Sequence, residues 1–267
     1  MPKPRSSTKP DEIVDYNADY KNRVIYFGNF NAHPDQDPTE INTQTISTAM
    51  VSIHIMARQA PKTPISLYFN STGGNMHDAW ALIDAMLSCS CQFKFYGFGS
   101  IMSAATLIMA AADERYLAPH SRVMIHDMSW DHYGMGSSHR VEQDLYQDMK
   151  EEKVKFLADN SNLGKEFFHT IINSGKDLFL TAQETVDIGL ADELIPPVKR
   201  GNLRQKRRHA KKPTSRKLAK SCNTLLSRLQ IPVKISEVMI HTPLVDECDP
   251  NIIIEELSAQ QSEGQND

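Results

Sequence analysis

The stretch ISLYFNSTGGNMHDAWALIDAML, residues 65–87, contains the transition that decides the fold. Residues 65–69 form a short run rich in aliphatic and aromatic side chains, which predicts a buried β-strand. Gly73 and Gly74 then mark a turn, and apolar residues recur at helical spacing from residue 76 to residue 87. The stretch therefore predicts a strand, a glycine turn and a helix in direct succession.

The same alternation continues on both sides of this stretch. Further strands are predicted at residues 23–27, 93–98 and 122–125, and further helices at residues 41–59, 101–112 and 140–160. Thr181-Ala-Gln-Glu184 is a capping box that begins one more short helix, which ends at Gly189. Strands that alternate with helices favour right-handed crossovers and a largely parallel sheet, so we expect an α/β fold.

Length and composition indicate one globular domain with an appendage. The 267 residues are 40% hydrophobic and 23% charged, close to the average for globular proteins. The sequence lacks an uncharged apolar run of about 18 residues, and its first residues do not have the pattern of a secretory signal. The four cysteines, Cys89, Cys91, Cys222 and Cys248, lack zinc-finger spacing. We therefore expect a cytoplasmic protein with reduced thiols, no metal and no membrane span.

The distribution of charge separates the two parts of the chain. The net charge is −4, yet no acidic residue occurs between Glu193 and Glu237, and residues 199–220 are rich in lysine and arginine. We expect a polar segment at 1–20, a domain at 21–197 and a basic, flexible tail at 198–267. The basic stretch has no aromatic residue, which favours a solvated linker over contact with nucleic acid or another polyanion. Residues 233–239 and 251–257 are apolar enough for a strand, a short helix or a docking peptide.

Ser103 is a candidate nucleophile because it lies at the start of a predicted helix made of small residues. The unpaired amides and the positive dipole end of such a helix can stabilise a developing oxyanion. The commoner role for a serine at this position is a helix N-cap. The backbone amides at Gly73-Gly74 are a second candidate for contact with a substrate carbonyl, although the phosphate-loop pattern is missing.

His126 and Asp177 complete a possible catalytic set. His126 follows the predicted strand 122–125, at the strand end where ligand chemistry usually occurs in parallel sheets. Asp177 precedes the capped helix and could accept a hydrogen bond from the imidazole N–H that faces away from Ser103. Taken singly, His126 is more often a half-buried structural histidine, and Asp177 a solvated loop aspartate, than a catalytic residue. The chain order serine, histidine, aspartate matches none of the three best-known triad orders.

Four segments together resemble the proteolytic subunit of the Clp proteases. They are KNRVIYFG (residues 21–28), ISLYFNSTGGN (65–75), PHSRVMIH (119–126) and KDLFLTAQETVDIGLAD (176–192). The resemblance covers residues 21–197 and implies a Clp/crotonase fold with a superhelix of repeated units. The helix at 140–160 would be the handle that joins two rings.

The resemblance also implies a function and a set of site residues. Ser103 would be the nucleophile, His126 the general base and Asp177 the orienting carboxylate, with the amides of Gly74 and Ala104 holding the oxyanion. The expected activity is serine-type endopeptidase hydrolysis of proteins and peptides through an acyl-enzyme. The expected assembly is a homo-oligomeric ring, with a double heptamer as one form. No cofactor is expected, because ATP would be used by a separate Clp-type unfoldase ATPase.

Several departures from the family pattern leave alternatives open. The family sequence Ala-Ser-Met-Gly-Ala is replaced by Met102-Ser-Ala-Ala-Thr, which makes Ser100 a second candidate nucleophile. The Gln-Pro that follows the family histidine is Asp127-Met128 here, and residues before 21 do not match the axial loop. The long extension suggests a phage origin.

Three other functions remain possible from the sequence. They are a crotonase-type acyl-CoA enzyme, a catalytically inactive ring subunit, and a signal-peptide-peptidase type that pairs a serine with a lysine such as Lys176.

Overall fold

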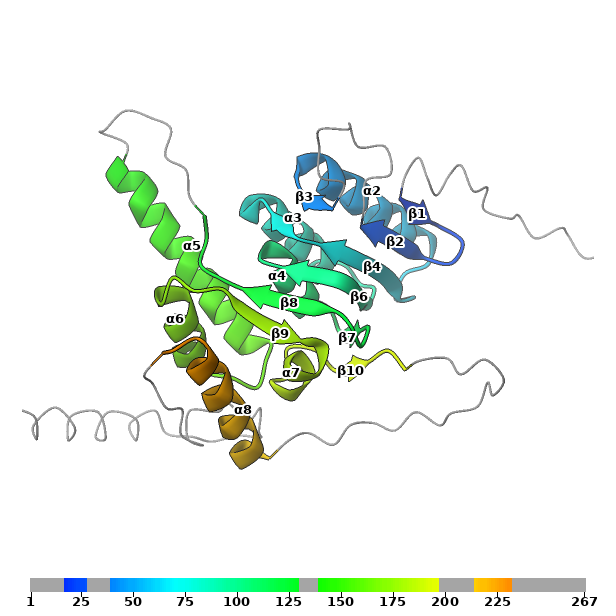
Figure 1. Cartoon of the computed structure of the whole chain (residues 1–267). Coiled ribbons are helices and arrows are strands. Elements are labelled where there is room, and N and C mark those ends of the chain that lie inside the picture. Colours follow the sequence, from blue (N-terminus) through cyan, green and yellow to red (C-terminus); the bar gives the residue numbers. More distant parts are fainter. Residues whose placement is uncertain (1–16, 28–38, 130–138, 197–213, 232–267) are drawn as a thin grey trace, which may run out of the picture.

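The computed structural model describes residues 17–27, 39–129, 139–196 and 214–231 (Figure 1). Within these residues the main sheet has eight strands. They are β1 (Ala18–Asp19), β2 (Val24–Phe27), β4 (Ile65–Ser71), β6 (Phe93–Met102), β7 (Glu114–Leu117), β8 (Arg122–Ile125), β9 (Leu178–Thr181) and β10 (Glu193–Leu194). A small second sheet pairs β3 (Glu40–Ile41) with β5 (Gly73–Gly74).

The long strand β6 is the centre of the main sheet. It pairs in parallel with β4 on one side, and on the other side first with β7 and then with β8. β2 extends the sheet beyond β4 in parallel, whereas β9 pairs with β8 in antiparallel orientation. The strands between the two edges are therefore parallel, and the predicted α/β class is confirmed.

The helices pack against the sheet and against one another. They are α2 (Thr43–Gln59), α3 (Met76–Leu87), α4 (Ala104–Ala110), α5 (His139–Asp159), α6 (Lys165–Asn173), α7 (Ala182–Asp187) and α8 (Ser215–Arg228). Every residue of α4 is buried, because α3 and α5 pack on either side of it. In Figure 1 the long helix α5 extends past the end of the strands, whereas α8 lies beside α6 and α7. The core thus surrounds α4, the helix that follows Ser103.

The boundary between β6 and α4 differs from the sequence prediction. We expected the strand to end at residue 98 and the helix to span residues 101–112, but the strand continues to Met102 and the helix begins at Ala104. The cause is the pairing of residues 100–102 with residues 122–124 of β8, which holds this part of the chain extended. As a result Ser103 lies in a turn between a strand and a helix.

Helix α8 lies inside the segment 198–267, for which we expected a basic, flexible tail. The chain is helical from Ser215, with Thr214 as the N-cap, and one face of the helix is buried in the core. The buried residues of this face recur at helical spacing: Leu218, Ala219, Cys222, Leu225 and Leu226. Residues 197–213, and the segments 233–239 and 251–257, lie outside the described residues.

Two further observations bear on the predictions from composition. Cys89, Cys91 and Cys222 are free thiols, and Cys248 lies outside the described residues. Among the described helices, none combines the length and the apolar character that crossing a bilayer requires.

Candidate active site

Ser103 occupies a strained turn. Its φ of 55° and ψ of −122° lie in a region that residues other than glycine rarely adopt. Such backbone strain costs about 1–3 kcal/mol and recurs at functional sites, including the strand-turn-helix that exposes the nucleophile of some hydrolases. The Ser103 side chain makes no N-cap hydrogen bond, although the residue stands at the N-cap position of α4. Its hydroxyl is therefore available for another partner.

Neighbouring backbone holds this turn in place. The Ser103 N–H donates to the carbonyl of Met124 in β8 at 2.9 Å. On the other side, Gly73 has a φ of +105°, and a Cβ added there would lie 2.7 Å from the Ser103 Cβ. Only glycine permits both this conformation and this close approach. The glycine turn predicted from the sequence thus packs directly against Ser103.

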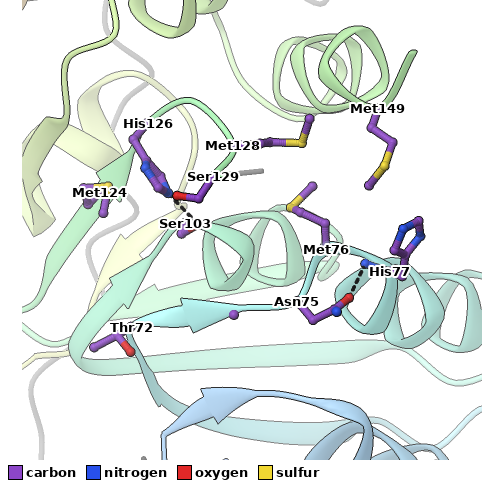
Figure 2. Close-up of a pocket in the computed structure, with 11 residues that line it drawn as sticks. Thr72, Asn75, Met76, His77, Ser103, Met124, His126, Met128, Ser129 and Met149 are labelled. Carbon is purple, nitrogen blue, oxygen red and sulfur yellow. Dashed lines mark hydrogen bonds between the residues drawn. The ribbon is translucent and has the colours of Figure 1, made fainter. Parts of the chain in front are cut away.

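The structure brings Ser103 and His126 into contact. The Nε2 of His126 lies 2.7 Å from the Oγ of Ser103, within hydrogen-bond distance (Figure 2). The sheet register explains this contact. Met102 of β6 is paired with Met124 of β8, and Ser103 and His126 follow one and two residues later. Parallel strands present their carboxyl ends at the same edge, and the serine and the histidine meet there.

Asp177 lies near the other ring nitrogen of His126. Ile125 of β8 is paired with Leu178 of β9 in an antiparallel ladder. His126 follows Ile125 and Asp177 precedes Leu178, so the two residues lie next to each other at the end of this ladder. The Nδ1 of His126 and the Oδ1 of Asp177 are 3.9 Å apart, close but longer than a hydrogen bond. The Asp177 side chain is 54% exposed, against 22% for His126.

A cavity of about 400 Å³ adjoins this cluster. Its lining contains Ser103, His126 and Gly74, together with two groups of side chains. The apolar group is Met76, Met124, Met128 and Met149, and the polar group is Thr72, Asn75, His77 and Ser129 (Figure 2). Methionine side chains form adaptable apolar surfaces, so the cavity suits an apolar side chain of a bound molecule.

The remaining candidates from the sequence differ in position. Ala104 is the first residue of α4, and its N–H has no partner within the helix. Ser100 lies within β6, where its backbone N–H donates to the side chain of Asn70, and it is not part of the cavity lining. Lys176 donates from Nζ to the carbonyl of Leu229 in the segment after α8. The geometry therefore favours Ser103 over Ser100.

Lys153 is a residue of the site that the sequence analysis missed. Its side chain is only 2% exposed, and Nζ donates to the carbonyl oxygen of His126 at 2.8 Å. Asp127, next in the chain, accepts a hydrogen bond from Lys150 at 3.3 Å. A signal was present in the sequence, because Lys153 is four residues from both Met149 and Leu157 on the buried face of α5.

Burial and charge set the protonation of these groups. Burial lowers the pKa of Lys153 to about 8, with the carboxylate of Asp127 acting in the opposite direction and Lys150 adding to the decrease. The pKa of His126 is lowered from 6.5, first by burial and then by the charge of Lys153, while Asp177 and Asp127 oppose the decrease. His126 is therefore neutral at pH 7, the state in which it can accept a proton.

Replacing Lys153 by methionine is expected to raise the pKa of His126, because a positive charge that disfavours the imidazolium is removed. NMR titration of the His126 ring protons measures this shift. Lys155→Met is the matched control, since Lys155 is exposed on the same helix and pairs with Asp159. An unchanged or lower pKa of His126 in Lys153→Met would contradict the assigned effect of Lys153.

Sequence comparison shows which known proteins this chain is similar to. The family model for Clp protease matches residues 37–197. The ATP-dependent Clp protease proteolytic subunit 2 of Corynebacterium efficiens is 25% identical over 195 residues, which cover 70% of this chain and 92% of the relative. The subunit 2 of Mycolicibacterium paratuberculosis is 26% identical over 175 residues, covering 65% and 82%. The proteolytic subunit of Bacteroides fragilis is 29% identical over 175 residues, covering 65% and 79%. Since the family model spans more than half of the sequence, and its match contains the glycine turn, Ser103 and His126, the chain belongs to the Clp protease family.

Proposed function

We propose that this protein is a serine endopeptidase that hydrolyses peptide bonds through Ser103, His126 and Asp177. Membership of the Clp protease family makes the chain a peptidase of the proteolytic-subunit type. The observation that carries the proposed mechanism is the 2.7 Å contact between Ser103 Oγ and His126 Nε2 in a strained turn beside a cavity. A serine hydroxyl is a weak nucleophile by itself, and a hydrogen-bonded neutral imidazole is the group that activates it.

The proposed reaction has two halves. His126 Nε2 accepts the proton of Ser103 Oγ while this oxygen attacks the carbonyl carbon of the scissile peptide. The imidazolium then donates that proton to the leaving amine, which leaves an acyl group on Ser103. Water attacks the ester in the second half, with His126 again accepting and then returning a proton to Ser103.

The negative charge on the carbonyl oxygen requires nearby donors. We assign this role to the backbone N–H groups of Gly74, which lines the cavity, and of Ala104, the first residue of α4. Both flank Ser103, because Gly73 packs against the serine and Ala104 follows it in the chain. Partial positive charge at the N-terminus of α4 adds to this stabilisation.

Asp177 is the third member of the proposed triad. A carboxylate beside Nδ1 stabilises the imidazolium that forms during proton transfer and fixes the orientation of the ring. The separation of 3.9 Å requires the carboxylate to approach when substrate binds. Such hydrogen bonds are often long in unliganded enzymes and shorten in the substrate complex.

The alternatives have weaker support. A serine–lysine peptidase would need an amine next to Ser103, yet Lys176 Nζ donates to Leu229 and Lys153 Nζ donates to the carbonyl of His126. An acyl-CoA enzyme of the crotonase type has no use for a serine hydrogen-bonded to a histidine. An inactive ring subunit would not need the strained conformation of Ser103, which costs stability.

Exposure to a fluorophosphonate is expected to attach one adduct to Ser103, detectable by mass spectrometry of the peptides. His126→Ala should slow the labelling by roughly 10²- to 10⁴-fold, because the general base is lost. Asp177→Ala should also slow it, through loss of the group that orients His126. Ser100→Ala is the matched control and should be labelled at the unaltered rate. An adduct on Ser100, or undiminished labelling of His126→Ala, would contradict the proposed mechanism.

The proposal includes assembly into a homo-oligomeric ring that encloses the active sites, in the cytoplasm. The relatives are named as subunits of ATP-dependent proteases, so a separate Clp-type ATPase is the proposed partner. Helix α5, the proposed handle, exposes Val141 and Leu145, which are apolar side chains suited to contact with a second copy of the chain.

Light scattering should therefore give a mass that is a multiple of the 30.1 kDa chain. The double variant Val141→Asp and Leu145→Asp is expected to reduce this mass, because charges on α5 would oppose contact between rings. The exposed Lys155 on the same helix provides a control in Lys155→Asp. A monomeric mass of the parent protein at micromolar concentration would rule out the ring.

A further inference from the structure

Helix α8 lies beyond residue 197, the last residue that the family model matches, yet it is part of the core. Its buried face includes Leu218, Cys222, Leu225 and Leu226, and it packs beside α7. Leucine side chains buried to this extent contribute about 1.5–3 kcal/mol each when removed from water. The attachment of α8 is therefore strong enough to influence the elements that it contacts.

Polar contacts connect the end of α8 to the element that follows Asp177. The Nη2 of Arg228 donates to Glu184 Oε1 at 2.6 Å, and Nη1 lies 3.5 Å from the carbonyl oxygen of Phe179 in β9. Glu184 also accepts a hydrogen bond from the backbone N–H of Thr181, the last residue of β9, at 2.8 Å. Arg228 thus links α8 to β9 and to the first turn of α7.

A second contact reaches the segment just before β9. Lys176 donates from Nζ to the carbonyl oxygen of Leu229, at the C-terminal end of α8. A cation is favourable there, because the last carbonyls of a helix lack intrahelical partners and carry partial negative charge. Lys176 is the residue that precedes Asp177 in the chain, so this contact acts next to the carboxylate of the proposed triad.

The turn that contains Lys176 follows α6 directly and is held by it up to Gly175, whose N–H donates to the carbonyl of Ile172 at 3.3 Å. Gly175 has a φ of +64°, and a Cβ added there would meet no atom within 4 Å. The backbone N–H of Lys176 donates to Ser174 Oγ at 3.2 Å, which is a contact within the turn and does not anchor it to another element. The contact of the Lys176 side chain with Leu229, in contrast, ties the part of the turn next to Asp177 to α8.

We propose that α8 is a positioning element of the active site, which fixes the turn that presents Asp177 to His126 by holding Lys176. This inference rests on the proposed function of Asp177. The β8–β9 ladder sets the backbone of Leu178 opposite Ile125, but the ladder ends there and leaves Asp177 without a paired partner. A displacement of about 1 Å at such a residue can slow catalysis on the order of 100-fold.

Cys222 provides a reporter of whether α8 is attached. Its side chain is fully buried in the described structure, and burial raises the pKa of the thiol to about 12. A thiol reagent can reach Cys222 when α8 detaches, and mass spectrometry distinguishes this site from the other cysteines. The rate of labelling at Cys222 therefore measures detachment without any need for enzyme activity.

The test compares Arg228→Ala and Leu226→Ala with the control Lys220→Ala, in the full-length protein. Lys220 is exposed on the same helix. Lys220→Ala therefore removes one positive charge from α8, as Arg228→Ala does, and leaves the buried face of α8 unchanged. Both test variants are expected to increase labelling of Cys222 and to slow acylation of Ser103 by a fluorophosphonate on the order of tenfold. Lys220→Ala should change neither rate.

A double-mutant comparison separates positioning from a general loss of stability. If α8 acts through Asp177, Arg228→Ala should have no further effect on acylation in an Asp177→Ala background. The inference would be overturned if Arg228→Ala slowed acylation of Ser103 to the same extent in the Asp177→Ala background. It would also be overturned if Arg228→Ala made Cys222 accessible while acylation of Ser103 was unchanged or faster.

A readout that needs no activity distinguishes this inference from the proposed function. Asp177 raises the pKa of His126 through its charge. Detachment of α8 should therefore lower the pKa of His126, measured by NMR, in Arg228→Ala but not when Asp177 is already alanine. Absence of acylation in the parent protein would refute the proposed function. In that case a lowered pKa in Arg228→Ala would still support the positioning role, and an unchanged pKa would refute it.

Discussion

The pairing of β6 with β8 is the constraint on which the rest of the site depends. Residues 100–102 are hydrogen-bonded to residues 122–124, which keeps the chain extended up to the residue before Ser103. The serine must then turn sharply into α4, and this explains its positive φ. The same strand β8 ends next to His126 and pairs with β9, which begins after Asp177. One strand thus brings together three residues that are far apart in the sequence.

Packing around this strand keeps the strained turn in place. Gly73 approaches Ser103 too closely for any side chain, while α4 is buried along its whole length behind the serine. A strained residue persists only when its surroundings stabilise it more than the strain costs, about 1–3 kcal/mol. Lys153 adds a hydrogen bond to the carbonyl of His126, so that α5, the proposed handle, also contributes to the position of the imidazole.

The sequence predicted most of the longer strands and helices, but not the details that depend on tertiary contacts. The helix at residues 76–87 was predicted with its observed limits, because the glycine turn and Leu87 mark its two ends. The strands β7 and β9 and the helix α6 were not predicted. The sequence of β7, Glu-Arg-Tyr-Leu, has two charged residues and one buried side chain, whereas the apolar residues of β9 and α6 were a usable signal. The conformation of Ser103 results from strand pairing, which a single sequence does not show. The burial of Lys153 results from helix packing, and its spacing from Met149 and Leu157 was a sequence signal that the prediction did not use. Helix α8 could have been predicted from the spacing of Leu218, Cys222 and Leu225, but the basic residues around it favoured a linker.

The central claim is that the register of β6, β8 and β9 places Ser103, His126 and Asp177 for joint catalysis. A crystal structure of the protein with a peptidyl phosphonate bound to Ser103 would test it most directly. The account predicts that the separation of His126 Nδ1 and Asp177 Oδ1, 3.9 Å in the free protein, shortens to a hydrogen bond of about 2.7–3.2 Å. A carboxylate that stays at its present distance or turns to solvent in that complex would contradict the role assigned to Asp177.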